Sequence, residues 1–387
     1  MTDNDFKLFE ILRNSLWSQE LHNERIPNRI REELQVQAVE GLTASVYQNE
    51  DKLKYKMARQ FLWMARIQED TVRRLQSHGI PVAVIKGTAS GIYYPEPFLR
   101  TYGDIDLLVP SEHYTTAIHL MLRNGFMQKG EIGSSHTALY KGGYLFELHQ
   151  RIPGLESVTE GKFILHYILS GLDHIQTGNI KNPNTFFPML PWQQHGLELI
   201  WHFRAHLYNG IGLRHVIDWM MFVHHYLDDA AFLDYQRILE NAGLLILAKT
   251  VTRMCQLFLG LEESITWCRD AGDELCTELM DYILGQGNFG KKRQDDKTIK
   301  VLSNYRTPKS IYKGMQNRGL YSWEALKKYP FLRPFAWLYV GIHEGKKFLF
   351  SDSRERWLES RNEILQRREF LIVFTEAEFV GRSARHI

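Results

Sequence analysis

The sequence predicts an α+β fold, in which a small mixed β-sheet follows a helical N-terminal segment and precedes a large α-helical region. Two observations lead to this prediction. Short apolar runs typical of strands, punctuated by glycine and proline, concentrate in residues 79–155. Apolar residues at helical spacing dominate residues 1–78 and 156–387. We therefore expect three regions with these boundaries, the middle one holding the sheet.

The N-terminal segment is expected to be helical from about residue 5 to residue 78. Its clearest part contains the run Phe61–Ala65 and ends at His78-Gly79-Ile80, where glycine is typical of a helix stop. Two buried-type strands follow, at Val82–Ile85 and Asp104–Val109. The next helix is expected to begin with Ser111 as its N-cap and to end at Gly125.

Helical periodicity returns over residues 160–280, with few strand signals. Proline-containing stretches at 182–184 and 188–191 predict loops within it. Residues 285–315 are rich in glycine and lysine, which indicates an exposed loop or a lid over a substrate. A charged helix is expected from Ser353 to about Phe370.

Composition narrows the class of protein. Charged residues make up 24% of the chain and the net charge is +2, so no overall bias towards nucleic acid or membrane surfaces exists. The N-terminus lacks a basic-then-apolar signal pattern, and no apolar run approaches the length of about 18 residues that spans a bilayer. The cysteines, Cys255, Cys268 and Cys276, are expected to be buried and reduced, which favours a cytoplasmic protein.

Two aspartates at the second strand carry the strongest chemical signal. Asp104 and Asp106 are two residues apart, so strand alternation directs both carboxylates to one face. Two neighbouring carboxylates repel each other unless a positive charge lies between them. Mg²⁺ suits such a position, because it binds carboxylates together with substrate phosphates.

A glycine turn follows the first strand at Lys86-Gly87-Thr88. Glycine lets the backbone approach a ligand closely, and free N–H groups at the start of the following helix attract anions. Lys86 and Arg100 add positive charge that suits phosphate groups, although Arg100 could instead form a structural pair with Asp104. We therefore expect a phosphate site opposite the aspartates.

A third polar group lies on a hairpin predicted over residues 134–150, with its turn at Gly142-Gly143. Alternation places Glu147 and His149 on one face of its second strand. Polar groups on an apolar strand need partners. If this strand lies beside Asp104–Val109, Glu147 completes a cluster of three carboxylates, and His149 either hydrogen-bonds to that cluster or is a core histidine.

These motifs resemble a known family. The resemblance is strongest over residues 78–152, in the motifs Lys86-Gly87, Tyr94-Pro95, Arg100, Asp104–Val109 and Glu147-Leu148-His149. Two further stretches resemble it, Gly212–Trp219 and, more weakly, Gly287–Gly290. The family is an uncharacterised bacterial nucleotidyltransferase family of the polymerase-β-like (minimal) nucleotidyltransferase superfamily. Members of the superfamily usually carry Gly-Ser after the first strand, where this chain has Gly87-Thr88.

The resemblance implies an enzyme that moves a nucleoside monophosphate, with AMP expected, from a nucleoside triphosphate to an acceptor hydroxyl and releases pyrophosphate. It implies a requirement for Mg²⁺ or Mn²⁺. The residues expected to hold the metal and to act in catalysis are Asp104, Asp106 and Glu147, with Glu147 also a candidate general base. The residues expected to contact the nucleotide are Lys86, Gly87, Thr88, Arg100 and His149.

The acceptor is left open by the sequence. A small molecule or a protein side chain is favoured over nucleic acid, because the small net charge offers no basic stripe for a phosphate backbone. The helical region from residue 156 onward is expected to contact the acceptor or a partner. The rival interpretation is a non-catalytic module that binds nucleotide or a partner, for example within a toxin–antitoxin-like pair. Three carboxylates argue against it, since a pure binder needs no acceptor activation.

Other polar pairs have less specific explanations. Arg214 and Asp218 are four residues apart on a predicted helix, so an ion pair along the helix is expected. His202 and His206 have the same spacing and could line the acceptor cleft. Zinc is disfavoured there, because the intervening residues lack the glutamate of the zinc protease motif and no cysteine is near. His215 has no assigned role.

Two stretches near the C-terminus are ambiguous. Lys291-Lys292-Arg293 is expected to be a solvated loop, with a mobile substrate loop as the alternative. Tyr329–Ile342 is aromatic and apolar but too short to span a membrane, so a core helix or a partner-binding face is expected.

Overall fold

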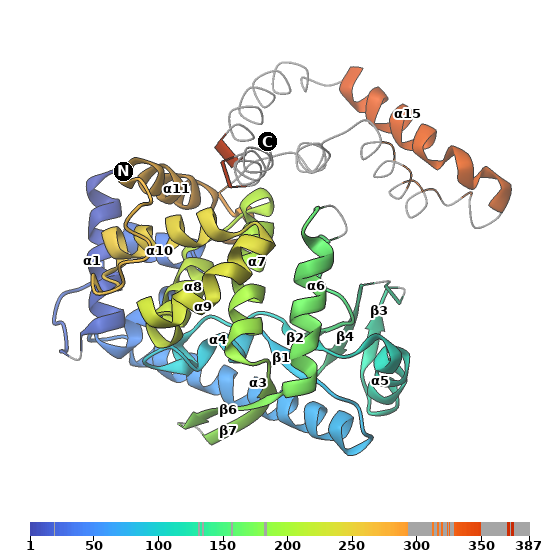
Figure 1. Ribbon diagram of the computed structural model, residues 1–387, viewed down its shortest axis with the longest axis horizontal. Helices are drawn as coiled ribbons and strands as arrows, with labels where there is room; N and C mark the ends of the chain where they lie inside the picture. The colour runs from blue at the N-terminus through green and yellow to red at the C-terminus, as the bar shows by residue number, and fades with distance from the viewer. Residues whose placement is uncertain are drawn as a thin grey trace. The chain divides into compact units, whose positions relative to one another are not determined.

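The computed structural model describes residues 1–292 apart from 19, 131, 134, 156–157 and 182–183, together with 329–349 and single positions between 312 and 374. The chain forms two compact units, Met1–Lys292 and Arg293–Ile387. The first unit contains the sheet and every residue that the sequence predicts for the site (Figure 1).

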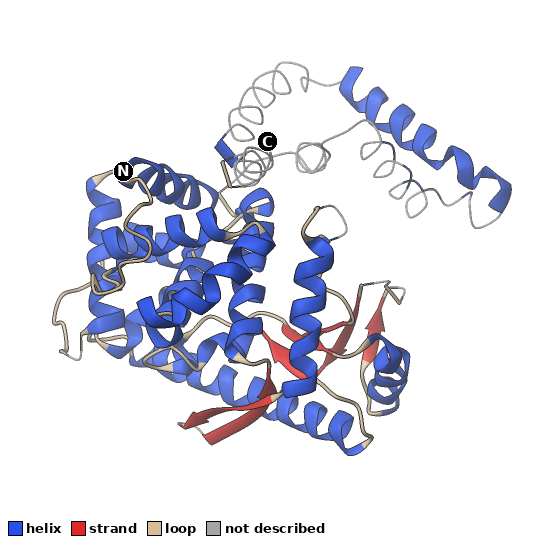
Figure 2. Cartoon of the chain, in the orientation of Figure 1, coloured by secondary structure: helices blue, strands red, loops and turns tan. Residues whose placement is uncertain are grey.

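The predicted mixed sheet is confirmed, and it has seven strands in the order β3-β4-β5-β2-β1-β7-β6 (Figure 2). The two central strands run antiparallel to each other, whereas β5 is parallel to β2 and β7 is parallel to β1. The strands are β1 (Ala83–Ile85), β2 (Ile105–Leu108), β3 (Met127–Lys129), β4 (His136–Lys141), β5 (Tyr144–His149), β6 (Gln176–Lys181) and β7 (Asn184–Met189).

The centre of the sheet is apolar, and this fixes the position of its polar ends. All residues of β1 and β2 are buried. Helix α3 (Asp51–Ser77) packs against β7, and α5 (Ser111–Arg123) packs against β5. Asp104 directly precedes β2, so the acidic pair lies where the buried strand begins.

The N-terminal segment is helical as predicted, but it is divided into separate helices. They are α1 (Asp3–Trp17), α2 (Asn28–Val36), the 3₁₀ turn η1 (Glu40–Ser45) and α3. Helix α1 lies beside α10 (Leu245–Leu259), where the indole N–H of Trp17 donates to the Leu259 carbonyl at 2.7 Å (Figure 1). The beginning of the chain therefore packs on the helices that follow the sheet.

The boundaries of α5 correct one prediction and confirm another. Ser111 is the first helical residue, and Pro110, in extended conformation, occupies the N-cap position, so Ser111 is not the cap. Gly125 adopts a φ of 83° just after the helix, as a glycine stop requires. The predicted hairpin is also confirmed, because β4 and β5 pair in antiparallel register around Gly142-Gly143, both with positive φ.

A second hairpin was missed by the sequence analysis. The stretch predicted as helix and loops contains β6 and β7, which pair along their full length. Pro188 lies within β7, opposite Thr177, while β7 pairs with β1 only through Val84 and Met189. Because most of the β7 edge that faces β1 forms no strand-to-strand hydrogen bonds, a proline without an N–H is tolerated there. The predicted turn at 182–184 falls largely outside the described residues.

The rest of the first unit is helical, as predicted, and its helices gather on one side of the sheet (Figure 2). Helix α8 forms their centre, since every residue from Leu213 to Val223 is buried. The three cysteines are buried and free, also as predicted. The helices are α6 (Gly161–Ser170), α7 (Trp192–Asn209), α8 (Leu213–Tyr226), α9 (Asp229–Ala242), α10 and α11 (Asp273–Gln286), with short turns α4 (Gly87–Gly91), η2 (Pro97–Leu99), η4 (Gly171–His174) and η5 (Asn288–Gly290).

In the second unit, the aromatic stretch forms the 3₁₀ turn η6 (Pro330–Phe335) and the helix α15 (Ala336–Leu349). Within the described part of the chain, no helix combines the length and the hydropathy that crossing a membrane demands. Most of the predicted loop at 285–315 and of the charged helix at 353–370 lies outside the described residues.

Candidate functional site

A cavity of about 330 Å³ lies between the polar ends of the central strands and the helices α7 and α8. It collects most of the residues that the sequence predicts, together with several that it does not. The polar and aromatic side chains around it, with Gly87, are Lys86, Arg100, Asp104, Asp106, Glu147, His149, Glu198, Trp201, His202, His206, Arg214, His215, Asp218 and Phe289.

Asp106 is the buried centre of the acidic group. Its Oδ1 accepts hydrogen bonds from Lys86 Nζ at 3.1 Å and from His149 Nε2 at 2.9 Å. Burial would raise the pKa of this carboxyl, but the charge of Lys86 and the hydrogen bond from His149 outweigh burial and hold the pKa well below its ordinary value. Asp106 is therefore ionised, and His149 acts as the hydrogen-bond donor that the sequence analysis considered.

The backbone of Lys86 is strained. Its φ of 58° and ψ of −153° lie in a backbone region that residues other than glycine rarely adopt. This conformation directs the chain from β1 into the short α4 turn while the ammonium group reaches Asp106. Strain of this kind persists only where the surroundings impose it, and it is typical of functional sites.

Glu147 joins the cluster through the sheet register. It is the direct partner of Asp106 across the parallel pair of β2 and β5, which confirms the predicted juxtaposition. One ligand atom each from Asp106, Glu147 and His149 lies within 4.8 Å of the others. The hydrogen bond from His149 lowers the pKa of Glu147, so this half-buried carboxylate is also ionised at neutral pH.

Asp104 faces the same cavity without a cation of its own. No salt bridge joins it to another residue in the described part of the chain. Burial raises its pKa, repulsion by Asp106 and Glu147 adds to the effect, and Lys86 offsets part of it. The cluster thus holds more negative charge than Lys86 neutralises, and its oxygen donors suit a hard divalent ion.

Of the residues predicted to contact phosphate, Lys86, Gly87 and Arg100 line the cavity and Thr88 does not. Gly87 lines the cavity with a φ of 47°, next to Lys86. The hydroxyl of Thr88 is buried and donates to Gln68 Oε1 on α3 at 3.0 Å. Arg100 lines the cavity, but its guanidinium binds both oxygens of Asp218, at 2.8 and 2.7 Å. Contact between these groups and phosphate stays a prediction.

The predicted ion pair between Arg214 and Asp218 is wrong. Asp218 instead accepts two hydrogen bonds from Arg100 and one from the hydroxyl of Tyr94, at 2.7 Å. The guanidinium of Arg214 instead makes one long contact to the Thr101 carbonyl, at 3.4 Å, and packs over the ring of Phe289. Its Nε has no hydrogen-bond partner within the described part of the chain, and Arg214 is a buried cation that borders the cavity.

Glu198 was not singled out by the sequence analysis. Its side chain is 1% exposed, neither carboxylate oxygen accepts a hydrogen bond from the residues that the structure describes, and Lys86 Nζ is 4.0 Å away. Burial raises the pKa of Glu198 to about 7, with the charge of Lys86 opposing it. The available signal was the spacing of Glu198, His202 and His206 at four-residue intervals, which places all three on one face of α7.

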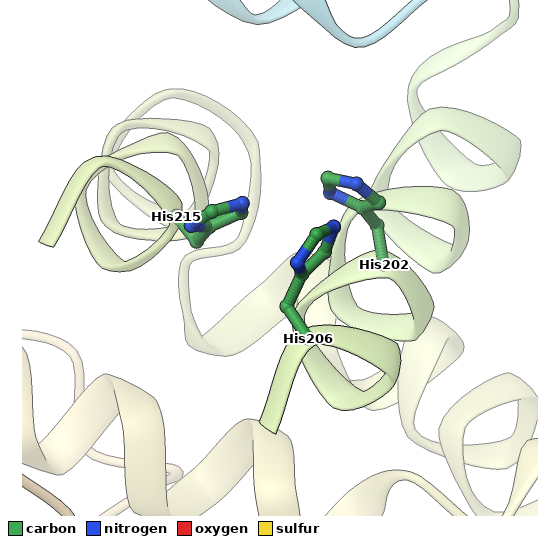
Figure 3. A group of neighbouring side chains, drawn as sticks. All are labelled: His202, His206 and His215. Carbon is green, nitrogen blue, oxygen red and sulfur yellow. The ribbon is translucent and has the colours of Figure 1, made fainter. Parts of the chain in front are cut away.

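Three histidines form a second cluster at the helical wall of the cavity. His202 and His206 project from α7 and His215 from the start of α8, and their rings point towards one another (Figure 3). Burial lowers the pKa of His206 to about 4 and lowers the pKa values of His202 and His215 as well. All three rings are therefore neutral near pH 7.

Comparison with known proteins decides the family. The family model described as "Uncharacterised nucleotidyltransferase" matches residues 18–260, which include all the cavity residues except Phe289. This chain belongs to that nucleotidyltransferase family. The match starts in the N-terminal helices and ends after α10, so it spans both walls of the cavity.

Among curated proteins no match was found. A solved structure with similarity to this nucleotidyltransferase is that of an antigenic nucleotidyltransferase-like protein from Paracoccidioides brasiliensis. The two are 16% identical, with a TM-score of 0.31, over 51% of this chain and 92% of the other.

Membership of the nucleotidyltransferase family indicates a transferase with a nucleotide substrate. The structure brings together Lys86, Gly87, Asp104, Asp106, Glu147 and His149, and Arg100 borders the same cavity. Thr88 is the one predicted site residue that does not line it. Glu198, His215 and the place of Arg214 at the cavity were not predicted from the sequence.

Proposed function

We propose that this protein transfers a nucleoside monophosphate, with AMP expected, from a nucleoside triphosphate to an acceptor hydroxyl and releases pyrophosphate. The observation that carries the proposal is the acidic cluster: Asp106 and Glu147 are register partners, and Asp104 lines the same cavity. Membership of the polymerase-β-like superfamily, a bacterial source and a cytoplasmic location belong to the same proposal, the last supported by three free, buried cysteines.

The donor set fits Mg²⁺ or Mn²⁺. Asp104, Asp106 and Glu147 supply only carboxylate oxygens, which hard divalent ions prefer. Burial raises the pKa of Asp104, and repulsion by Asp106 and Glu147 adds to the effect, so a cation beside Asp104 would favour its ionised form. When bound, such an ion would neutralise phosphate charge and stabilise the attacking and leaving oxygens.

The protein's own groups have separable roles in the proposed reaction. Lys86 and Arg214 place positive charge at the cavity, where the triphosphate would lie. Glu147, ionised and partly exposed, takes the proton of the acceptor hydroxyl. The hydroxyl oxygen then forms a bond to the α-phosphorus, the bond from that phosphorus to the bridging oxygen breaks, and pyrophosphate leaves. The walls formed by α7 and α8 would select the acceptor, for which a small molecule or a protein is favoured.

The test is transfer of label from each α-³²P-labelled nucleoside triphosphate, with Mg²⁺ and with or without cell extract. Wild type should label an acceptor, whereas Asp104→Asn should not, because the cluster loses a metal-binding charge. Asp234→Asn, on the exposed face of α9, is the matched control and should transfer normally. Normal transfer by Asp104→Asn would refute the proposal, and nucleotide binding without any transfer would favour the non-catalytic module.

A further inference from the structure

The histidine cluster has the spacing of a metal site. The ring centroids of His202, His206 and His215 are 4.4, 4.6 and 5.3 Å apart, and one ring nitrogen from each lies within 4.8 Å of the others. Tetrahedral Zn²⁺ has Zn–N bonds of about 2.0–2.1 Å, which places its nitrogens about 3.3–3.4 Å apart. To bind an ion, each pair of ring nitrogens therefore has to approach by about 1.5 Å or less.

Backbone groups hold two of these rings at Nδ1. Nδ1 of His206 lies 3.3 Å from the Gly210 carbonyl, and Nδ1 of His215 lies 3.3 Å from the Gly212 carbonyl and 3.4 Å from the Gly212 N–H. In the tautomer in which each Nδ1 donates to its carbonyl, Nε2 keeps a free lone pair, and a backbone carbonyl in this role is typical of metal-bound histidine. Nε2 of His215 is buried and has no hydrogen-bond partner among the described residues, which is costly unless a ligand occupies that point.

The turn that supplies those carbonyls is held in place. An added Cβ at Gly210 would lie 2.1 Å from the nitrogen of Gly290, and one at Gly212 would lie 2.8 Å from Cα of Asn288. The ring of Phe289 packs edge-on against His206 and His215, with centroids at 5.4 and 6.2 Å. The cluster is therefore set in a rigid frame, as a preorganised site needs.

We propose that His202, His206 and His215 bind a divalent transition-metal ion of the zinc type, separately from the carboxylate cluster. Imidazole ligands suit Zn²⁺, whereas Mg²⁺ prefers carboxylates. The lack of a glutamate between His202 and His206 does not count against binding, because in the zinc protease motif that residue is the general base and not a ligand.

Three protein ligands leave a fourth position, which is typical of a zinc site that binds water or substrate. Here the cluster borders the cavity, and the guanidinium of Arg214 lies at the same wall. No carboxylate is among the three ligands, so the site keeps a positive charge. The fourth ligand is therefore hydroxide or an anionic group of the molecule that enters the cavity. This site does not depend on the proposed nucleotidyl transfer.

The test is titration of the full-length protein, stripped of metal, with Co²⁺ and Zn²⁺ in excess Mg²⁺ that saturates the carboxylates. Calorimetry should show one equivalent bound, and Co²⁺ should develop the visible absorption of a tetrahedral site. His206→Gln and His215→Gln should each weaken binding by at least about 100-fold, as loss of a direct ligand exceeds loss of an outer partner. His119→Gln, on the exposed part of α5, should bind as wild type does.

Three outcomes would overturn the site. They are the absence of Co²⁺ and Zn²⁺ binding by folded wild type, binding that survives both histidine substitutions, and binding that is lost in Asp104→Asn. Circular dichroism of each variant shows whether it is folded, and two separate histidine variants keep the test usable if one of them does not fold.

Discussion

Glu198 shows how burial changes the chemistry of a single side chain. An acid with a pKa of about 7 in the folded protein and an ordinary value of 4.5 binds a proton more readily when folded. Folding is therefore favoured by this group at low pH, and the contribution is lost as pH rises from about 4.5 through 7. The loss is on the order of 3 kcal/mol, from the size of that shift.

Glu198→Gln should remove this pH dependence, because an amide of the same shape does not titrate. We expect the variant to gain stability relative to wild type by on the order of 3 kcal/mol between pH 5 and pH 8. Urea unfolding of both proteins in EDTA at the two pH values measures it. If the difference in unfolding free energy between wild type and Glu198→Gln were the same at pH 5 and pH 8, Glu198 would not be a buried proton-binding group.

Arg100 and Asp218 form a buried ion pair with two hydrogen bonds, and Tyr94 adds a third. Removing one charge from such a pair leaves the other buried without a counter-charge, which costs about 3–5 kcal/mol. Asp218→Asn should lower the free energy of unfolding by that amount.

The measurement is the free energy of unfolding from urea titration at pH 7. Asp234→Asn is the exposed control, and its free energy of unfolding is expected to lie within about 0.5 kcal/mol of the wild-type value. If Asp218→Asn were equally stable, Arg100 would have to find its counter-charge elsewhere.

At the scale of elements, the turn between α7 and α8 connects the histidine cluster to the segment Gly287–Gly290. Gly210 has a φ of 97°, and a Cβ there would strike the backbone of Gly290. Gly210→Ala should therefore destabilise the protein, by about 1–3 kcal/mol for the strained backbone alone.

Gly285→Ala is the matched control, since Gly285 lies within α11, has open space around its Cα and has no positive φ. Alanine favours helix there, so this variant should be more stable than wild type by about 0.5–1 kcal/mol. Thermal unfolding of both variants decides the matter, and equal effects would mean that the turn is not constrained.

Local signals in the sequence predicted the elements with strong local patterns. The strands at residues 83–85 and 105–108 and the hairpin around Gly142-Gly143 are correct, because apolar runs and paired glycines act on neighbouring residues. The hairpin β6–β7 was missed, since Pro188 favours a loop locally and only the pairing with β6 and β1 makes β7 a strand. Contacts between segments distant in sequence override such local preferences.

At the scale of the whole molecule, the cavity exists because the first unit places α7 and α8 opposite the polar ends of β1, β2 and β5. The carboxylates could be predicted, because strand alternation and one pairing assumption bring Asp104, Asp106 and Glu147 together. Glu198 and His215 could not, because their relation to the site depends on how helices pack against the sheet. Because of the same packing, Asp218 forms its ion pair with Arg100 and not with Arg214, its neighbour on the helix.

Binding at this cavity should stabilise the whole unit. A ligand present at about 100 times its dissociation constant adds roughly 2.7 kcal/mol to the stability of a protein that binds it only when folded. Mg²⁺ with a non-hydrolysable nucleoside triphosphate should therefore raise the melting temperature of wild type, and EDTA should reverse the shift. Asp104→Asn should lose most of the shift and Asp234→Asn should keep it. An equal shift in all three proteins would locate nucleotide binding away from the carboxylates.

The ammonium group of Lys86 has a consequence for the order in which ligands arrive. Held 3.1 Å from Asp106, it is a built-in counterion for the acidic cluster before any substrate enters. A metal ion arriving alone must compete with it, whereas a triphosphate offers the ammonium group a new anionic partner. In the proposed reaction, metal and nucleotide should therefore bind synergistically, each increasing the affinity for the other, so Mg²⁺ should bind the carboxylates more weakly without nucleotide than with it.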